Sequence, residues 1–388
     1  MKKPKVLIVH NYYQVPGGED TVVENEKKLL IENGHEVILY TRNNYEIKIR
    51  GILGKLVLPF ETIFSLKTYN EVKKIIRKNN INIVHVHNTL PLISPSVYYA
   101  ARNSKVPVVQ TIHNFRLLCP AATLSRNNVI CEKCIQKGLF YSIKNKCYRN
   151  SLLQSIISAI NLVIHRRIGT YNKIDRYITL TESNKMKFIK LINEDRISVK
   201  PNFVKHDEKI NENYCGDYFL YFGRIDKVKG IDFLLNSWKK LKEYKLVIAG
   251  TGPYEDEMKN LINKYSMNNV ITVGYQTGSQ LTELIKKSRA IVVPSQWYEP
   301  FGMVAIEAFQ MGKPVIAGDI GALSSIVVDG VNGLLFEYNN HSDFIKKIKK
   351  MTSDELVKKL MNGAYESYLK NYTDKENYKI LLKIYNSL

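Results

Sequence analysis

The sequence predicts an α/β protein of two domains, each built on a doubly wound parallel sheet. Its 388 residues are enough for two domains of ordinary size. In both halves, short apolar runs typical of buried parallel strands alternate with longer amphipathic segments typical of helices. The apolar content of 45% and charged content of 24% are those of a globular protein, and without a run of 18 apolar residues no transmembrane helix is expected.

The formal net charge of +21 is distributed unevenly along the chain. Residues 1–200 carry +18 of it, and between Val72 and Ile174 there are 16 basic residues and a single acid, Glu132. A field of this sign attracts polyanions, such as nucleic acid, anionic lipid headgroups or pyrophosphate carriers. Charge that served only general solubility would not be confined to one half.

The first half begins with an expected strand at 6–10, whose apolar stretch is too short for a signal peptide, so we expect a cytoplasmic protein. The loop at 11–19 follows, and its Gly17 and Gly18 allow backbone to approach a ligand closely. The remaining expected elements are a helix at 22–33, a strand at 36–40, an amphipathic helix at 60–78, strands at 83–88 and 106–114, a helix at 152–167 and a strand at 175–181.

Three histidines stand on or after expected strands of this half. His85 and His87 are two residues apart and so share one face, which suits either a metal pair or the lining of a cleft. No third ligand for such a metal lies nearby in the sequence. His113 ends the strand at 106–114, where a histidine is either structural or part of a site.

Four of the five cysteines fall within 29 residues, at Cys119, Cys131, Cys134 and Cys147. A CxxC pair with two further thiols about a dozen residues away is typical of a structural zinc site. Disulfides and unlinked buried thiols are the alternatives, and a reducing compartment disfavours disulfides.

The expected helix at 152–167 has apolar residues at helical spacing and arginines at its end, Arg166 and Arg167. A core helix is one interpretation. Because its surroundings are basic, a helix that lies on a membrane interface is the other.

The second half opens with a strand at 218–222, followed by Gly223, Arg224, Lys229 and a helix at 231–241. A strand, a glycine, two cations five residues apart and a helix start are typical of a diphosphate cradle. A strand with a glycine turn at Gly250 and another that ends at Gly274 and Tyr275 follow. Three terminal helices are expected at 343–351, 354–362 and 375–388.

The stretch at 290–317 predicts a strand, an irregular loop, a helix and a second strand. The free N–H groups of Gly302, Met303 and Val304 would point out of the first turn of that helix and favour an anion, typically a phosphate. Glu299 lies in the loop and Glu307 on the helix, eight residues apart. They are either two solvated glutamates or acceptors for sugar hydroxyls beside the phosphate.

The run Glu299-Pro-Phe-Gly-Met-Val-Ala-Ile-Glu307 resembles the E-x7-E motif of the family 4 retaining glycosyltransferases, which have the GT-B fold of two Rossmann-like domains facing across a cleft. The resemblance implies that Glu299 contacts the transferred sugar and Glu307 the ribose of the donor, while Phe301, Gly302, Met303 and Val304 receive the sugar and the distal phosphate.

The same resemblance implies roles for residues outside that run. Arg224 and Lys229 match the family's pyrophosphate clamp, and the loop with Gly17 and Gly18 faces the donor phosphates. Gly223, Gly250, Gly274 and Tyr275 fall at the nucleotide side, with the base near the last two. His113 matches the histidine that contacts the sugar being moved.

The sequence has no Asp-x-Asp motif, so a metal-bridged donor diphosphate has no obvious ligand. Charge neutralisation is therefore expected from Arg224, Lys229 and helix N-termini, without a catalytic divalent metal. The resemblance implies a front-face attack in which the leaving phosphate takes the acceptor proton.

The Cys-containing loop and the opening His-Asn-Tyr-Tyr-x-x-Pro-Gly-Gly-Glu resemble bacterial transferases that build capsular or other surface polysaccharides. These act on polyprenyl-diphosphate-linked saccharides at the inner face of the plasma membrane, with UDP-, dTDP- or GDP-linked donors. The resemblance implies an acceptor-side domain at 1–200, a nucleotide-sugar domain at 201–371, a hinge at 197–203 and a last helix, 372–388, that packs back on the first domain.

Two other functions stay open on the sequence alone. A nucleotide-sugar epimerase of the same fold would bind a donor but need neither an acceptor nor a membrane. A nucleic-acid-binding protein would explain the positive charge, although no recognised binding motif is present.

Overall fold

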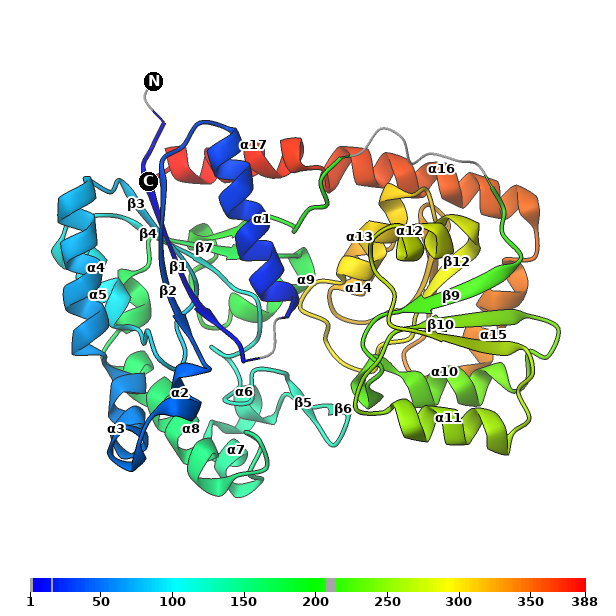
Figure 1. Cartoon of the computed structure of the whole chain (residues 1–388), viewed down its shortest axis with the longest axis horizontal. Coiled ribbons are helices and arrows are strands. Elements are labelled where there is room, and N and C mark those ends of the chain that lie inside the picture. Colours follow the sequence, from blue (N-terminus) through cyan, green and yellow to red (C-terminus); the bar gives the residue numbers. More distant parts are fainter. Residues whose placement is uncertain (1–2, 15–16, 207–213) are drawn as a thin grey trace.

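The computed structural model describes residues 3–14, 17–206 and 214–388, and within them it forms two parallel sheets of six strands each (Figure 1). The first sheet has the strand order β2-β1-β3-β4-β7-β8 and the second has the order β11-β10-β9-β12-β13-β14. A small antiparallel pair, β5 and β6, stands apart from both sheets. The predicted α/β fold with two doubly wound parallel sheets is therefore confirmed.

The strands of the first sheet are β1 (Val6–Tyr12), β2 (Val37–Asn43), β3 (Ile83–Asn88), β4 (Val108–Thr111), β7 (Arg176–Thr179) and β8 (Ile197–Val199). Those of the second sheet are β9 (Tyr218–Phe222), β10 (Lys245–Ala249), β11 (Val270–Gly274), β12 (Ser288–Val293), β13 (Val315–Gly318) and β14 (Gly333–Phe336). The small pair is β5 (Ser125–Arg126) and β6 (Val129–Ile130).

The helices of the first half are α1 (Gly18–Glu32), α2 (Glu46–Ile49), α3 (Ile52–Ile63), α4 (Leu66–Asn79), α5 (Ser96–Asn103), α6 (Lys133–Lys137), α7 (Phe140–Lys144), α8 (Leu152–Arg167) and α9 (Glu182–Phe188). Those of the second half are α10 (Ile231–Trp238), α11 (Glu255–Lys264), α12 (Gly278–Lys287), α13 (Met303–Gln310), α14 (Leu323–Ile326), α15 (His341–Lys350), α16 (Asp354–Asn371) and α17 (Asp374–Asn386). In the described ranges no helix combines the length and the apolarity needed to cross a bilayer.

Alternation along the strands buries both faces of the first sheet. Val6 and Ile8 of β1 pack in a cluster with residues of α1 and α17, whereas Leu7 and Val9 pack in another cluster with residues of α4 and α5. Since successive side chains of a strand point to opposite faces, one apolar run supplies two cores. The same holds for β9, where Phe219 and Leu220 belong to different clusters.

Two helix predictions in the first half need correction. The helix expected at 22–33 begins at Gly18, because the Asp20 carboxylate accepts a hydrogen bond from the Gly17 N–H at 2.9 Å and caps the helix early. The single helix expected at 60–78 is wrong, since α3 ends at Ile63 and α4 begins at Leu66. The Ser65 hydroxyl accepts a hydrogen bond from the Thr68 N–H and starts the second helix.

Two further boundaries differ from the prediction. The helix expected at 354–362 continues to Asn371 as α16. The first residues of the expected hinge, Ile197–Val199, form β8 and pair with β7, and the chain leaves the first sheet after them. The predicted domain boundary at residue 200 stays a prediction, and residues 207–213 lie outside the described residues.

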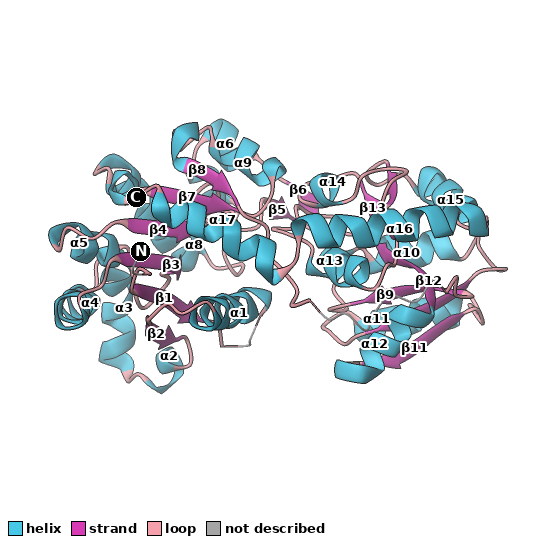
Figure 2. Cartoon of the chain, turned by 90° about the horizontal axis from the view of Figure 1, so that it is seen from above, coloured by secondary structure: helices cyan, strands magenta, loops and turns pink. Residues whose placement is uncertain are grey.

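The last two helices lie on different halves of the molecule (Figures 1 and 2). Leu360 and Tyr368 of α16 pack in clusters of the second sheet. Leu381 and Tyr385 of α17 pack in the same cluster as β1 of the first sheet. One face of the first sheet is therefore covered by α17, a helix that follows the whole second half in the sequence.

A buried ion pair joins three elements of the first half, α1, β3 and β8, to the returning helix α17. The Lys200 ammonium, just after β8, lies 2.8 Å from the Glu26 carboxylate of α1 and donates to the Asn377 side chain of α17 at 3.2 Å. His85 of β3 places its Nδ1 3.0 Å from the other Glu26 oxygen. Burial alone would raise the pKa of Glu26, but Lys200 and then His85 outweigh it and hold the pKa well below its usual range.

We expect Lys200→Met to cost about 3–5 kcal/mol of unfolding free energy, because it leaves the Glu26 carboxylate buried without its main counter-charge. The double variant Lys200→Met/Glu26→Gln should recover most of that loss, since it buries no charge. Urea denaturation followed by circular dichroism measures both. A single-variant loss below about 1 kcal/mol, as for a surface pair, would contradict this account.

Candidate active site

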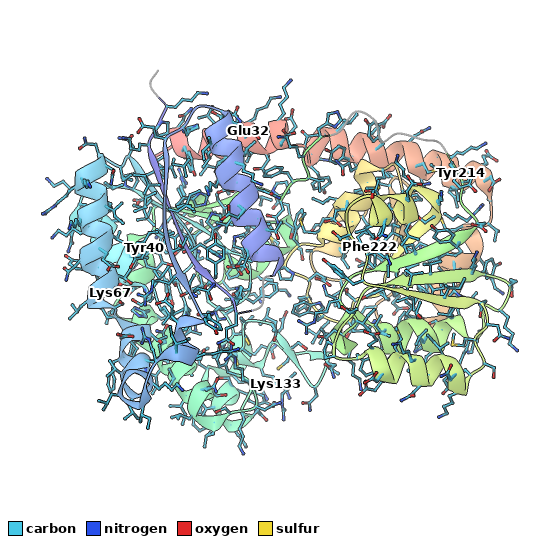
Figure 3. The ribbon with its side chains drawn as sticks, in the orientation of Figure 1. Glu32, Tyr40, Lys67, Lys133, Tyr214 and Phe222 are labelled. Atoms are coloured by element: carbon cyan, nitrogen blue, oxygen red, sulfur yellow. The ribbon has the colours of Figure 1, made fainter. Side chains whose placement is uncertain are left out.

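A cleft of about 390 Å³ lies between the two halves, at the carboxyl ends of their strands. Gly18, Glu19 and His113 line it from the first half, and Lys229 and Glu299 line it from the second. Figure 3 shows Phe222, another lining residue, at the end of β9 that faces the first half. Ligands of parallel α/β sheets bind at this edge.

Most of the residues predicted for a site lie around this cleft. Those in its lining are Gly18, His113, Gly223, Arg224, Lys229, Glu299, Phe301, Gly302, Met303 and Val304. Those outside the lining are Gly17, Gly250, Gly274, Tyr275 and Glu307. Val15 and Pro16, which belong to the predicted glycine loop, lie outside the described residues.

Three of the predicted glycines, Gly223, Gly250 and Gly274, stand at the ends of adjacent strands, and all three have a positive φ. At Gly250, where φ is +152°, close backbone packing also excludes a side chain, because a Cβ there would lie 1.9 Å from the Gly223 carbonyl oxygen. The Gly250 N–H donates to the Gly274 carbonyl at 2.7 Å. Gly250 thus lets the ends of β9 and β10 approach each other, and a contact of Gly250 or Gly274 with a donor stays a prediction.

Lys229 is brought to the cleft by a short turn that is pinned on both sides. The Asp226 side chain accepts a hydrogen bond from the Val228 N–H and caps the turn. Gly230 has a φ of +82°, and a Cβ on it would lie 1.9 Å from the Pro294 carbonyl oxygen. The Val228 carbonyl accepts a hydrogen bond from the Gln296 N–H, so the turn is fixed against the loop that follows β12.

Lys229 and Glu299 form an ion pair in the cleft. The Lys229 Nζ lies 2.7 Å and 2.9 Å from the two Glu299 oxygens, and the Ser295 hydroxyl donates to Glu299 at 2.6 Å. Burial would raise the pKa of Glu299, but the charge and hydrogen bonds of Lys229, with that of Ser295, lower it below its usual value. Two groups predicted for different parts of a donor therefore neutralise each other.

The N-terminus of α13 faces the same cleft. Gly302 precedes the helix with a φ of +120°, and a Cβ there would lie 2.9 Å from the Leu323 side chain. The first-turn residues Met303 and Val304 line the cleft, where their position suits an anion. Glu307, one turn further along α13, is half-buried, and burial raises its pKa.

Arg224 stands at the rim of the cleft. Its side chain is 66% exposed and forms an ion pair with Asp226. A guanidinium that is this accessible can turn towards a phosphate. Its partner Asp226, whose side chain is 14% exposed, keeps the hydrogen bond that it accepts from the Val228 N–H.

His113 connects the cleft to the buried ion pair of the first half. Its Nε2 lies 2.9 Å from His87 Nδ1, and His87 Nε2 lies 3.3 Å from Glu26 Oε1. Burial lowers the pKa of His113 well below its usual value, and burial with the nearby His85 lowers that of His87 to about 4. Both imidazoles are therefore neutral at neutral pH, and His113 is held by a chain of buried contacts.

Glu26 lies beside the pair His85 and His87 and is a third possible metal ligand, which the sequence did not suggest. Ligand atoms of Glu26, His85 and His87 lie within 4.8 Å of one another, and in the described residues they form the only such group of three. Lys200 already places a positive charge 2.8 Å from Glu26, so the carboxylate has a counter-ion from the chain itself. The arrangement fits a positioning network for His113.

Tyr13, Glu19 and Asn202 are among the lining residues that the sequence-based prediction missed. Tyr13 donates a hydrogen bond to Glu19 at 2.9 Å, and burial raises the pKa of Glu19 to about 7. The Glu19 Oε1 and the Asn202 Oδ1 are buried and have no hydrogen-bond partner in the described part of the chain. The position of Glu19 directly after the glycine pair was the available signal.

The four clustered cysteines do not form a compact set of ligands. All five cysteines are free thiols, and no three of their sulfurs in the described chain lie within 4.8 Å of one another. A hydrogen bond with the Cys134 thiol lowers the pKa of Cys119 to about 6 and raises that of Cys134. The predicted structural zinc ion stays a prediction.

Two sequence families match adjoining parts of the chain. The profile described as Glycosyltransferase Family 4 matches residues 16–208, and the one described as Glycosyl transferases group 1 matches residues 203–370. The first begins after β1 and covers β2 to β8, and the second covers β9 to β14. Together they span most of the chain.

Individual proteins match over nearly the same length. The uncharacterized glycosyltransferase MJ1178 of Methanocaldococcus jannaschii is 25% identical over 401 residues, which cover 99% of this chain and 98% of that protein. An uncharacterized 41.2 kDa protein in the cps region of Klebsiella pneumoniae is 25% identical and covers 87% of this chain and 88% of its own. HepE of Anabaena, solved in complex with UDP, superposes with a TM-score of 0.70 at 16% identity, covering 99% of this chain and 100% of HepE.

The turn that carries Lys229 can be tested with two glycines that share a left-handed backbone. We expect Gly330→Ala, where a Cβ meets nothing within 4 Å, to cost about 1 kcal/mol of stability through backbone strain alone. Gly230→Ala should cost about 3 kcal/mol, because its Cβ also meets the Pro294 carbonyl. Urea denaturation compares them, and equal losses would show that the turn is not pinned against Pro294.

Proposed function

The chain belongs to the family 4 and group 1 glycosyltransferases, and from that membership we propose that it transfers a sugar, with retention of configuration, from a nucleoside-diphosphate sugar to a lipid-linked saccharide. Its two facing parallel-sheet halves have the GT-B arrangement. The observation that carries the proposal is the Lys229–Glu299 pair beside the N-terminus of α13, inside the cleft between the halves.

The proposed donor site combines three sources of positive charge. The ammonium of Lys229, the exposed guanidinium of Arg224 and the first-turn amides of α13 all border the cleft. Together they suit a diphosphate, whose charge must be stabilised as it leaves. The sequence has no Asp-x-Asp motif, and these groups supply the neutralisation, so the proposed reaction needs no catalytic divalent metal.

The ion pair also suggests how the site responds to a donor. A diphosphate that binds Lys229 replaces Glu299 as its partner, and the freed carboxylate can accept hydrogen bonds from hydroxyls of the sugar. Glu299 stays ionised throughout because its pKa is low. The neutral His113 contacts the sugar from the opposite half, and Glu307 accepts from the ribose.

The proposed chemistry is a front-face displacement at the anomeric carbon. The bond between that carbon and the diphosphate oxygen breaks, and the acceptor oxygen forms its bond on the same face. The acceptor proton passes to the departing phosphate oxygen, so the protein does not have to supply a nucleophile. Its task is to stabilise the leaving diphosphate and the positive charge that develops on the sugar.

The acceptor and the place of action are proposed from the charge of the first half and from the relatives. The sequence between Val72 and Ile174 contains 16 basic residues and a single acid, a balance that suits a lipid diphosphate and anionic headgroups. One relative is encoded in a cps region. We therefore place the protein in the synthesis of a surface polysaccharide, at the cytoplasmic face of the plasma membrane, with a UDP-, dTDP- or GDP-linked donor.

Lys229→Ala should lower the rate of sugar transfer by about 10²–10³-fold, because it removes one fixed positive group from the leaving diphosphate. Lys227→Ala is the matched control, since Lys227 is two residues away, outside the cleft lining, and near Asp232 at 3.5 Å. A panel of UDP-, dTDP- and GDP-sugars, followed by the release of nucleoside diphosphate, measures the rate. Equal rates for the two variants would remove Lys229 from the clamp, and an epimerised donor without transfer would replace the transferase proposal.

Glu307→Gln separates a binding role from a structural one. The raised pKa of Glu307 means that ionisation costs stability in the folded protein, so this cost is absent at low pH and appears as the pH rises through the folded pKa. The variant should therefore be at least as stable as the wild type at neutral pH, while its nucleotide affinity falls about tenfold or more. Calorimetric titration with UDP and thermal unfolding test both, and an unchanged affinity would refute the ribose contact.

A further inference from the structure

The helix α3 exposes an apolar face that the fold leaves uncovered. Ile52, Leu53, Leu56, Val57 and Phe60 are between 49% and 81% exposed, and Thr62 is the one buried residue of the helix. Ile49 of α2 and Leu153 of α8 extend the patch at 72% and 67% exposure. Contiguous apolar surface of this kind marks an interaction site, since isolated exposed residues alone need no explanation.

A groove of about 330 Å³ leads from this patch towards the active-site cleft. Figure 1 shows α2, α3 and α8 gathered at one end of the first half. Leu58 and Pro59 of α3 form part of the groove lining, and Leu153 and Ile157 of α8 also belong to it. Tyr13 lines both the groove and the cleft, so the two hollows adjoin. The volume of the groove is in the range of ordinary ligand sites.

Cations line the groove without carboxylate partners. Lys55, Arg116 and Arg149 belong to its lining, and in the described part of the chain none of them forms an ion pair. Both guanidinium groups lie 5.6 Å from the centre of the Tyr148 ring, and their charges lower its pKa although burial would raise it. The Arg116 Nε is buried and has no hydrogen-bond partner among the described residues.

The combination of apolar surface and unpaired cations selects one kind of occupant. A second copy of the chain would bring this basic face against itself, and like charges oppose such an isologous contact. Nucleic acid would use the cations but leave the exposed apolar face of α3 in water. A lipid that ends in a diphosphate satisfies both, because its anionic group suits the arginines and its chain suits a bilayer in contact with α3.

We propose that the groove between α3 and α8 binds the diphosphate of a polyprenyl-diphosphate-linked acceptor, with Arg116 and Arg149 as its anion-binding residues and the exposed face of α3 seated in the membrane. The inference rests on the proposed function and deepens it, since it names the site of the lipid acceptor. The saccharide attached to the diphosphate then extends past Tyr13 into the cleft that holds the donor.

The test is flotation of the purified full-length protein with two kinds of phosphatidylcholine vesicle. One kind contains undecaprenyl diphosphate, and the other contains phosphatidylglycerol at the same total negative charge. We expect stronger retention on the diphosphate vesicles. Arg149→Gln should lower that retention about tenfold, to the level of the phosphatidylglycerol vesicles, because a charge-assisted contact is lost.

The apolar face is tested separately. Leu53→Ser/Leu56→Ser should lower retention on both vesicle types by about tenfold or more, since two side chains no longer enter the bilayer. Both residues are exposed, so the melting temperature should not change. The matched controls are Leu369→Ser and Lys370→Gln on the exposed surface of α16, which should leave retention unchanged.

Equal retention of the wild type on both vesicle types, or an Arg149→Gln variant that keeps the preference, would overturn the diphosphate site. A dimer that the Leu53→Ser/Leu56→Ser variant breaks would assign the α3 face to a second copy instead. Titration with UDP, dTDP and GDP keeps the proposals distinguishable. Nucleotide binding without a vesicle preference rejects the groove alone, whereas no nucleotide binding to the wild type rejects the donor proposal.

Discussion

The buried contact between Glu26 and Lys200 is the constraint on which the rest of the first half depends. It joins α1, the end of β8 and α17, and through His85 and His87 it reaches His113 in the cleft. A carboxylate and an ammonium away from water are tolerable only when each has its partner, so these elements can form only together. The position of His113 in the cleft is thus tied to the packing of the whole half.

In the second half the charged side chains of Lys229 and Arg224 are accessible, as the proposed binding of a diphosphate requires. Lys229 is 30% exposed and Arg224 is 66% exposed, and each pairs with a carboxylate that a phosphate can replace. Gly230 and Asp226 fix the backbone that carries them, whereas the side chains stay accessible. A rigid turn with exchangeable ion pairs is suited to hold a diphosphate and to release it. One half therefore uses ion pairs to set geometry, and in the proposed donor site the other half uses them to bind.

The sequence predicted the sheets and ten of the residues that line the cleft, because apolar runs and strand-end glycines act locally. Gly223, Lys229 and Gly302 lie where strand, turn and helix patterns place them. It could not predict the Glu26–Lys200 pair, whose members are 174 residues apart, or the Lys229–Glu299 pair, which depends on how two loops meet. The break at Ser65 was missed because α3 and α4 are both amphipathic or apolar, and a single cap residue decides where one helix ends.

The return of α17 to the first sheet has a consequence for biosynthesis. Leu381 and Tyr385 cover strands whose residues leave the ribosome more than 200 positions earlier along the chain. The N-terminal half therefore cannot mature as soon as it emerges, although domains usually fold in the order of translation. Until the last helix arrives, one side of that sheet and the Glu26 carboxylate await their partners, so nascent chains of this protein should be clients for chaperones.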